Sequence, residues 1–253
     1  MMTANILEIH GLVSVVSRHP IINQLDFAIE EGELRVLVGP NGAGKTTLID
    51  LITGRHRPTA GQILFKGQRI DGRARHEIYR LGISRKFQVP TVYDNLTVFE
   101  NMSIGLRGHR SVFSSLGYRM TPAAVEQIER ILAQIKLLER AREEAFTLSH
   151  GEKQWLEIGM VVASDPQLLF LDEPTTGMTR EETNATARLI RDIAKTRSVM
   201  VVEHDMSFVR QIARTITVLH QGRKLAEGSV REVEDNPKVA EVYLGKVKIS
   251  AVS

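Results

Sequence analysis

The sequence predicts an α/β fold in which a sheet of buried parallel strands is interrupted by an inserted helical subdomain. The first observation is a set of short, almost wholly apolar runs at Leu34–Val38, Leu168–Asp172 and Val199–Glu203, which are typical of strands covered on both faces. The second is the region from Leu96 to Ile158, where apolar residues recur at helical spacing with charges between them. Strand-rich segments therefore flank a helical one.

These segments set the expected domain organisation. We expect a single domain over residues 1–253, because a chain of this length with 42% hydrophobic residues can bury a substantial core. The core should comprise about residues 1–88 and 166–253, with the helical subdomain at about residues 89–165. Residues 246–253 are expected to form a frayed tail.

The N-terminal third is expected to supply strands and one glycine-rich loop. Ile6–Val16, Leu25–Ile29 and Gln62–Lys66 have the composition of strands. The run Leu34–Val38 ends in glycines, and Thr46–Ile52 then carries helical spacing. The predicted order is therefore strand, glycine loop and helix.

The remaining helices are expected in the middle and last thirds. Apolar residues recur at helical spacing from Val125 to Leu138, and Gly105–Met120 is expected to interrupt the helical region as a loop or irregular insertion. Arg180–Thr196 is predicted to be a helix between two of the buried strands. Strand, helix and strand in this rhythm complete the α/β prediction.

Composition excludes several kinds of site and partner. The chain has no cysteine, which rules out disulfides, thiolate catalysis and cysteine-ligated metal centres. Its 33 basic and 30 acidic residues form no long block of one sign, so nucleic acid is not an expected partner. The N-terminus lacks a secretory signal, and no apolar run approaches the roughly 20 residues of a membrane span. Any membrane association is therefore expected to come through a partner protein.

The residues GPNGAGKT at positions 39–46 match the G-x-x-x-x-G-K-[ST] pattern of a phosphate-binding loop. Glycines let consecutive backbone N–H groups turn toward one anion, and the following helix start adds partial positive charge. Lys45 is expected to reach the β- and γ-phosphates of ATP, and Thr46 to offer its hydroxyl to Mg²⁺. A glycine-rich turn before a helix is the alternative, but the strand, loop and helix context favours phosphate binding. The predicted ATP-binding residues of the loop are Gly39, Pro40, Asn41, Gly42, Ala43, Gly44, Lys45, Thr46 and Thr47.

Two acidic residues stand at the carboxyl end of the second apolar run, where ligands of open α/β sheets bind. Asp172 is placed to hold Mg²⁺ through water, and Glu173, one residue further out, to orient or deprotonate the attacking water. A strand that ends in a solvated acidic turn would have the same sequence. The phosphate loop elsewhere in the chain favours the catalytic interpretation.

His204 follows the third apolar run and should emerge at the same sheet edge as Asp172. A lone histidine is usually structural. Here the predicted position favours a polar contact with the γ-phosphate and the attacking water, so His204 joins Glu173 as a candidate catalytic residue.

Residues 148–152 read LSHGE and precede a second expected helix, whose N-terminus could bind an anion. Ser149 and Glu152 also form an S-x-x-E capping box, which needs no ligand, and both interpretations can hold at once. If the helical subdomain points this helix start away from its own phosphate loop, it can bind ATP only on a second copy of the fold. ATP would then hold two subunits together.

The chain resembles the ATPases of ABC transporters over nearly its whole length. The resemblance rests on GPNGAGKTT (39–47), Gln88 in KFQVPT, LSHGE (148–152), LLFLDEP (168–174) and VVEHD (201–205), in this order. Finer features look most like the ATPase of urea transporters within the branched-chain amino acid uptake group. They are KFQVPTVYDNLTVFEN, LSHGEKQWLEIGM, GMTREET, VVEHDMSFVR and EVYLG.

The resemblance implies a P-loop NTPase (RecA-like) core with an N-terminal antiparallel β region. It implies a head-to-tail dimer that sandwiches two ATP molecules between the phosphate loop of one subunit and Ser149, His150, Gly151 and Glu152 of the other. Gln88 would act at the catalytic site, contact Mg²⁺ and water, and link the core to the helical subdomain, where a permease helix docks.

The same resemblance implies a place in a transporter. The chain would lie peripherally on the cytoplasmic face of the inner membrane, with a solute-binding protein as an indirect partner. The imported solute would be small and polar: urea first, with a branched-chain amino acid or another amide as the alternative. The second ATPase subunit could be another copy of this chain or a related chain.

Three positions depart from the pattern of the family. No aromatic residue stands at Val16 to stack on adenine, and His19 is a conceivable substitute. Glu152 stands where glutamine is common, and Thr179 where many relatives have aspartate. The first departure leaves undetermined which residue contacts the adenine base. The other two bear on phosphate binding and on crosstalk between the two ATP sites.

Two other classes of protein share part of this pattern. A soluble ABC ATPase of DNA repair or translation would usually carry long coiled coils, zinc modules or a second cassette, and the sequence shows none of these. A phosphotransferase kinase would share the phosphate loop but would leave LSHGE and His204 unexplained. The energy-coupling subunit of an uptake transporter is therefore the leading hypothesis.

Overall fold

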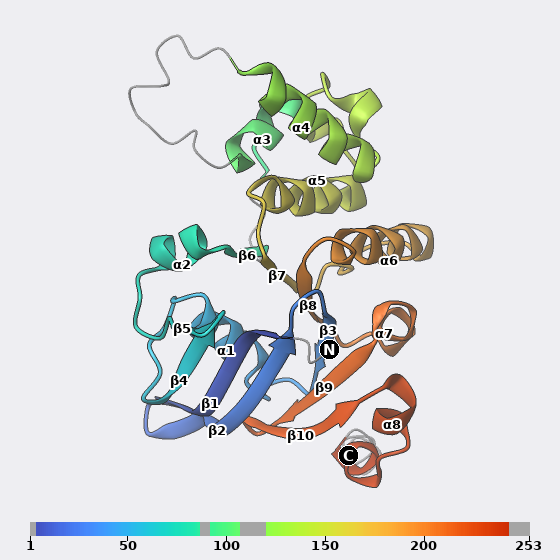
Figure 1. The fold of residues 1–253 in the computed structure, drawn as a ribbon. Helices are drawn as coiled ribbons and strands as arrows, with labels where there is room; N and C mark the ends of the chain where they lie inside the picture. The colour runs from blue at the N-terminus through green and yellow to red at the C-terminus, as the bar shows by residue number, and fades with distance from the viewer. Residues whose placement is uncertain (1–3, 87–91, 107–119, 243–253) are drawn as a thin grey trace.

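The computed structural model describes residues 4–86, 92–106 and 120–242, which form two packed sheets beneath a group of helices (Figure 1). The first sheet is antiparallel, in the order β2-β1-β4-β5, and is the antiparallel region that the resemblance implies at the N-terminus. Its strands are β1 (Asn5–Val16), β2 (His19–Glu30), β4 (Ala60–Phe65) and β5 (Gln68–Arg69).

The second sheet has the order β10-β9-β3-β8-β7-β6. All of its strands run parallel except β10, which pairs antiparallel with β9. The parallel sheet predicted from the apolar runs is thus confirmed, although the third run ends as a strand at Val202, one residue before the predicted end. The strands are β3 (Leu34–Val38), β6 (Ile83–Lys86), β7 (Leu168–Asp172), β8 (Ser198–Val202), β9 (Thr215–His220) and β10 (Arg223–Gly228).

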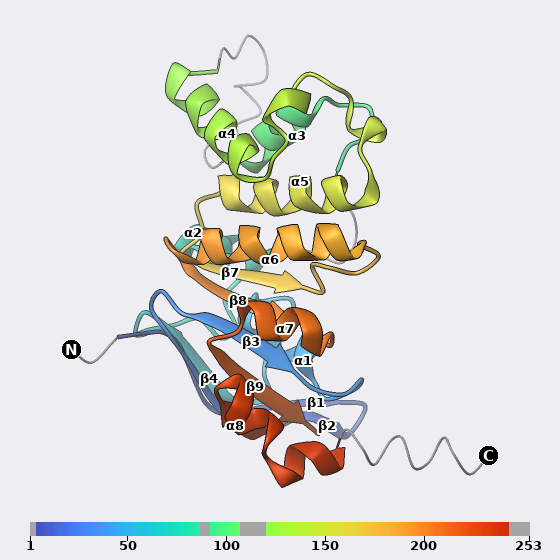
Figure 2. The same ribbon diagram turned by 90° about the vertical axis from the view of Figure 1, so that its right-hand side faces the viewer.

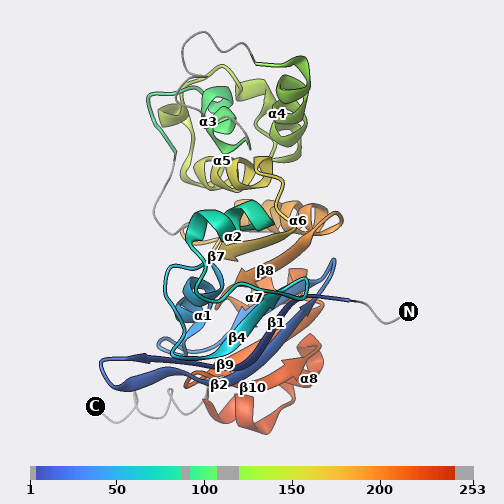
Figure 3. The same ribbon diagram turned by 60° about the vertical axis from the view of Figure 1, so that its left-hand side comes forward.

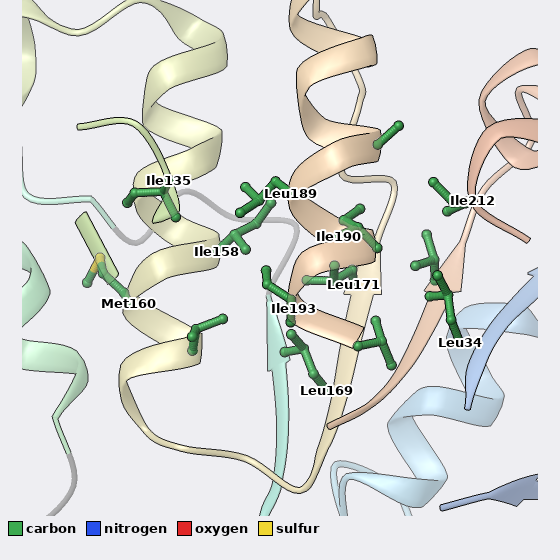
Figure 4. Packing of buried hydrophobic residues seen from close by; sticks show 14 of the residues in the cluster. Leu34, Ile135, Ile158, Met160, Leu169, Leu171, Leu189, Ile190, Ile193 and Ile212 are labelled. Atoms are coloured by element: carbon green, nitrogen blue, oxygen red, sulfur yellow. The ribbon is translucent and has the colours of Figure 1, made fainter. Parts of the chain in front are cut away.

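Both faces of the parallel sheet are covered, which explains why its central strands are apolar without alternation. Leu169 and Leu171 of β7 pack beneath Ile190 and Ile193 of α6 (Arg180–Ala194), as Figure 4 shows. The intervening Phe170 faces the other way, into a second cluster shared with α1 (Lys45–Ile52) and the antiparallel sheet. Because successive strand residues point to opposite faces, each apolar run contributes side chains to two hydrophobic clusters.

Within the residues that the structure describes, the helical subdomain comprises three α-helices and two short 3₁₀ turns, and it lies above the two sheets in Figures 2 and 3. Its helix starts are explained by local sequence: Thr97 and Ser149 form capping boxes, and Thr121 caps a helix with proline at its first position. The helices are α3 (Val98–Gly105), α4 (Pro122–Gln134) and α5 (His150–Ala163).

Among the residues with described placement, three shorter helices remain: α2 (Arg75–Leu81), α7 (Met206–Ile212) and α8 (Val230–Glu234). In the described parts of the chain, no helix is long and apolar enough to cross a membrane. The predicted helix Arg180–Thr196 is confirmed but ends at Ala194. Most of the predicted insertion Gly105–Met120 and the whole predicted tail lie outside the described residues.

Candidate nucleotide site

Neighbouring parallel strands deliver the predicted site residues to one edge of the sheet. The phosphate loop follows β3, His204 lies two residues beyond the end of β8, and Asp172 and Glu173 stand at the end of β7. Adjacent strands lie about 4.8 Å apart, so the ends of β3 and β7 are separated by about 10 Å. This is a span that the phosphates of one nucleotide and a bound cation can bridge. Gln88 lies beyond the end of β6 and outside the described residues.

The phosphate loop has the backbone geometry of an anion cradle. Gly42 and Gly44 have φ values of 78° and 102°, which residues with a side chain rarely adopt. Gly44 caps α1 without a side-chain hydrogen bond, so the first N–H groups of the helix are left for a ligand. The Nζ atom of Lys45 donates to the carbonyl oxygens of Gly39 at 2.6 Å and of Pro40 at 3.2 Å, which holds its charge over the loop.

Gly39 is required by close packing. A Cβ atom at this position would lie 2.3 Å from the backbone oxygen of Leu219, on the neighbouring strand β9. Backbone atoms cannot yield as a flexible side chain can. The loop therefore leaves β3 along a path that only glycine permits.

The oxygen donors expected at a magnesium site are present. Thr46 is exposed at the start of α1, and Asp172 is buried, with 3% of its surface exposed. In the described residues no group of three or more histidine and acidic side chains could hold a metal ion by itself. A hydroxyl and a carboxylate are oxygen ligands of the kind that Mg²⁺ takes, together with waters and substrate phosphates.

Glu173 and His204 lie side by side at the sheet edge where the sequence places His204 and Asp172. The Nδ1 atom of His204 is 3.5 Å from Oε1 of Glu173. Glu173 has a φ of 46°, in the left-handed region, and its N–H donates to the oxygen of Val202 at 2.9 Å. This turn lifts the carboxylate off the end of β7, where it is partly exposed, whereas Asp172 stays buried.

Glu203 is a site residue that no sequence signal indicates, because it looks like the last residue of an apolar strand. It is 1% exposed, and its carboxylate accepts from Thr175 Oγ1 at 2.6 Å and from the N–H of His204 at 3.1 Å. Thr175 belongs to the turn after Glu173. Glu203 therefore links the turn that follows Glu173 to the backbone of His204.

The predicted capping box at the start of α5 is confirmed. Ser149 Oγ accepts from the N–H of Glu152 at 3.2 Å, and Glu152 Oε2 accepts from the N–H of Ser149 at 2.7 Å. Ser149 and His150 are exposed, and His150 Nε2 lies 3.0 Å from the carbonyl oxygen of Thr176. The second helix start is thus accessible at the surface, next to the turn that follows Glu173.

Glu152 is accommodated by a neighbouring cation that no local sequence signal indicates. Arg140 Nη1 donates to Glu152 Oε2 at 2.6 Å. Burial raises the pKa of Glu152, but the hydrogen bonds from Arg140 and from the N–H of Ser149 outweigh it and hold this pKa below its ordinary value. The carboxylate of Glu152 is therefore ionised and paired.

The turn between β1 and β2 lacks an aromatic ring of phenylalanine, tyrosine or tryptophan. Val16 is 55% exposed, Ser17 and Arg18 have φ values of 49° and 67°, and His19 Nδ1 lies 2.9 Å from the oxygen of Ser17. The imidazole is therefore held by its own turn. An apolar tip, rather than a stacking platform, faces solvent here.

The fold and this edge of the sheet define an ATP-binding cassette, and the sequence matches agree. Residues 22–176 match the family described as ABC transporter, and residues 223–248 match the one described as branched-chain amino acid ATP-binding cassette transporter. The chain therefore belongs to the ABC transporter family, whose ATP-binding domains bind nucleotide and act as ATPases that power transport.

Within that family the chain falls in the branched-chain amino acid group. It is 35% identical to the transport ATP-binding protein BraF of Pseudomonas aeruginosa, across 97% of this chain and 100% of BraF. It is 32% identical to LivG of Escherichia coli K12, across 97% and 100% of the two chains. The crystal structure of the ADP conformation of an ABC-transporter cassette superposes with a TM-score of 0.85 at 28% identity, covering 96% and 100%.

Proposed function

We propose that the chain is the ATP-hydrolysing subunit of an ABC uptake transporter and that it powers import of a branched-chain amino acid or a related small polar solute. The observation that carries the proposal is the meeting of the phosphate loop, Asp172, Glu173 and His204 at one sheet edge, with a second helix start exposed at Ser149. The relatives that match along their full length are transport ATP-binding proteins, which supports the same function.

Hydrolysis would use these residues in distinct roles. The N–H groups of the phosphate loop and Lys45 bind the β- and γ-phosphates, and Thr46 and Asp172 hold Mg²⁺, with Gln88 as a further contact. Bound Mg²⁺ supplies positive charge that neutralises the phosphate oxygens. Glu173 accepts a proton from the attacking water, and His204 makes a polar contact with the γ-phosphate.

The second helix start acts on another subunit. Ser149, His150, Gly151 and Glu152 of one subunit bind the ATP that rests on the phosphate loop of the other, so that ATP favours the closed dimer. The exposure of Ser149 and His150 supports this, because a partner can reach them. Arg140 supports it as well, since it balances the charge of Glu152 beside the incoming phosphate.

A groove beside the site suits a segment of the permease. It has a volume of about 570 Å³ and lies between α2, β6 and the helices α3 and α5. Two large apolar side chains on its wall are unusually exposed, Tyr93 at 56% and Ile104 at 40%. Exposed apolar surface in a groove favours burial by a partner protein. The chain would then sit peripherally at the cytoplasmic face of the membrane, with a solute-binding protein as an indirect partner and no nucleic acid.

Two solutes are worth separating. The relatives BraF and LivG are named for branched-chain amino acid transport, which favours that solute. The stretches LSHGEKQWLEIGM and KFQVPTVYDNLTVFEN of this chain resemble the ATPase of urea transporters, which favours urea. Proteoliposomes that contain the chain with its permease and binding protein would decide: ATP-driven uptake of radiolabelled leucine without urea uptake supports the first solute, and the reverse supports the second.

Glu173→Gln tests the ATPase assignment. It keeps the shape of the side chain but removes the base, so hydrolysis should fall by about 10²–10⁴-fold while ATP binding persists. The variant should also accumulate as an ATP-bound dimer in size-exclusion chromatography. Glu181→Gln, an exposed acid on α6, is the matched control and should keep the parent rate. Hydrolysis at the parent rate by Glu173→Gln would remove Glu173 from its role.

A further inference from the structure

Arg85 is a buried arginine held between two carboxylates, one of which is the predicted magnesium ligand. Its side chain is 3% exposed. Its Nη1 donates to Oδ1 of Asp50 at 2.5 Å, and its Nη2 donates to Oδ2 of Asp172 at 2.8 Å. Asp50 belongs to α1, Arg85 to β6 and Asp172 to β7. One cation therefore links the helix that starts at the phosphate loop to the strand that ends at the catalytic carboxylates.

The strand register explains why these three side chains meet. Arg85 pairs with Phe170 across the parallel ladder, and Phe170 packs in the cluster that contains the apolar residues of α1. Asp172 is two residues beyond Phe170, so it lies on the same face of β7. Lys86 faces the opposite side of β6, where it pairs with Glu157 of α5 at 3.1 Å. The neighbouring buried cations therefore have different partners.

The positive charge of Arg85 offsets the repulsion between the carboxylates of Asp50 and Asp172. The side chains of Asp50 and Asp172 are 10% and 2% exposed, and two buried carboxylates close together repel each other. Arg55 and His56 also approach Asp50, at 3.8 Å each, but both are more than half exposed and are screened by water. Arg85 is the buried cation of this cluster, and the three groups together keep a charge of −1.

We propose that Arg85 is a positioning residue for the magnesium site. By holding Oδ2 of Asp172 against α1 through Asp50, it fixes the carboxylate relative to Thr46, which lies on that same helix. This inference rests on the proposed function, in which Asp172 and Thr46 hold Mg²⁺. Arg85 acts through Asp172, and such supporting contacts typically change metal affinity by about 10–100-fold.

The test must separate orientation from charge. Arg85→Met alone adds a net negative charge near the cation, which would by itself attract Mg²⁺. Asp50→Asn/Arg85→Met removes one charge of each sign and keeps the cluster at −1. The measurements are the Mg²⁺ concentration that half-saturates ATP binding, and the melting temperature without nucleotide. We expect the double variant to melt above Arg85→Met yet to need at least about tenfold more Mg²⁺ than the parent.

A second buried arginine provides the matched control. Arg35, near the start of β3, is 8% exposed and donates to Glu33 at 2.6 Å and to Glu227 at 2.5 Å. It repeats the arrangement of Arg85 at the amino end of its strand, away from the sheet edge that carries the site. Arg35→Met should lower the melting temperature and leave the half-saturating Mg²⁺ concentration at the parent value.

Three outcomes overturn the proposal. Parent-like half-saturation in the double variant would show that Arg85 only balances charge. If the double variant does not fold, Arg85→Lys replaces it, because lysine keeps the charge without the fork that bridges two carboxylates; parent-like half-saturation there has the same meaning. If ATP binding by the parent chain does not depend on Mg²⁺, the proposed magnesium role of Asp172 fails first, and the positioning role fails with it.

Discussion

Glu173 is the residue at which stability and catalysis should conflict most directly. Its φ of 46° lies in the left-handed region, which costs a residue with a side chain roughly 1–2 kcal/mol. At an ordinary site alanine is more stable than glycine by roughly 0.4–1 kcal/mol, because glycine loses more freedom on folding. We therefore expect the order to reverse here, with Glu173→Gly more stable than Glu173→Ala by about 1 kcal/mol.

The difference in stability between the two variants measures the cost of the left-handed backbone conformation at residue 173. Both lose the carboxylate, and with it the 3.5 Å approach to His204 and the 3.4 Å hydrogen bond from Thr176, so these terms cancel. Both should lose hydrolysis by about 10²–10⁴-fold. In a chain of 253 residues, a difference of about 1 kcal/mol corresponds to about 2–4 °C in melting temperature.

Thermal unfolding without nucleotide is the assay, and Glu181 supplies the reference pair. Glu181 is exposed in the first turn of α6, so Glu181→Gly should melt below Glu181→Ala, in line with helix propensity. The reasoning is refuted if alanine is the more stable replacement at both positions. That result would mean that residue 173 carries no backbone strain, and that its left-handed turn is not part of the site.

Three further predictions follow from the same site. Gly39→Ala should weaken ATP binding, because its Cβ would lie 2.3 Å from the oxygen of Leu219, where real contacts begin near 3.0 Å; parent affinity would contradict this. The parent should be more stable than Glu152→Gln above about pH 4.3, and this advantage should shrink as the pH falls through the lowered pKa of Glu152. The check is the midpoint of urea-induced unfolding of both proteins at about pH 7 and about pH 3.5. A difference in midpoint that stays constant between the two pH values would refute the prediction. Val16→Tyr should tighten ADP binding by about 0.5–1.5 kcal/mol through stacking, and unchanged affinity would place the base elsewhere.

The parts of the site that could be predicted are those with a local signal. An apolar run, then glycines, then helical spacing predicted β3, the phosphate loop and α1, and the structure places them as expected. The capping box of Ser149 and Glu152 joins residues three apart, so the sequence alone predicts it as well. The prediction that Asp172 and His204 share a sheet edge needed only the rule that parallel strands end together.

The parts that could not be predicted depend on pairs that are distant in sequence. The strand β6 reads Ile-Ser-Arg-Lys and looks exposed, yet Arg85 and Lys86 are buried because carboxylates on other elements neutralise them. The pairing of Arg140 with Glu152 is hidden for the same reason, since a charged residue on a surface-like segment has no periodicity that indicates its partner. Hydrophobic patterns identify which faces are buried, but they do not show which ions are buried with them.

Mixing two inactive variants tests the central claim, that one ATP is bound by helix starts from two polypeptides. Lys45→Ala disables the phosphate loop, and Ser149→Arg disables the second helix start. In a mixed head-to-tail dimer, the intact loop of the Ser149→Arg chain faces the intact Ser149 of the Lys45→Ala chain, so the mixture should regain ATPase activity that neither variant has alone. A mixture as inactive as its components would contradict a site shared between two copies of this chain.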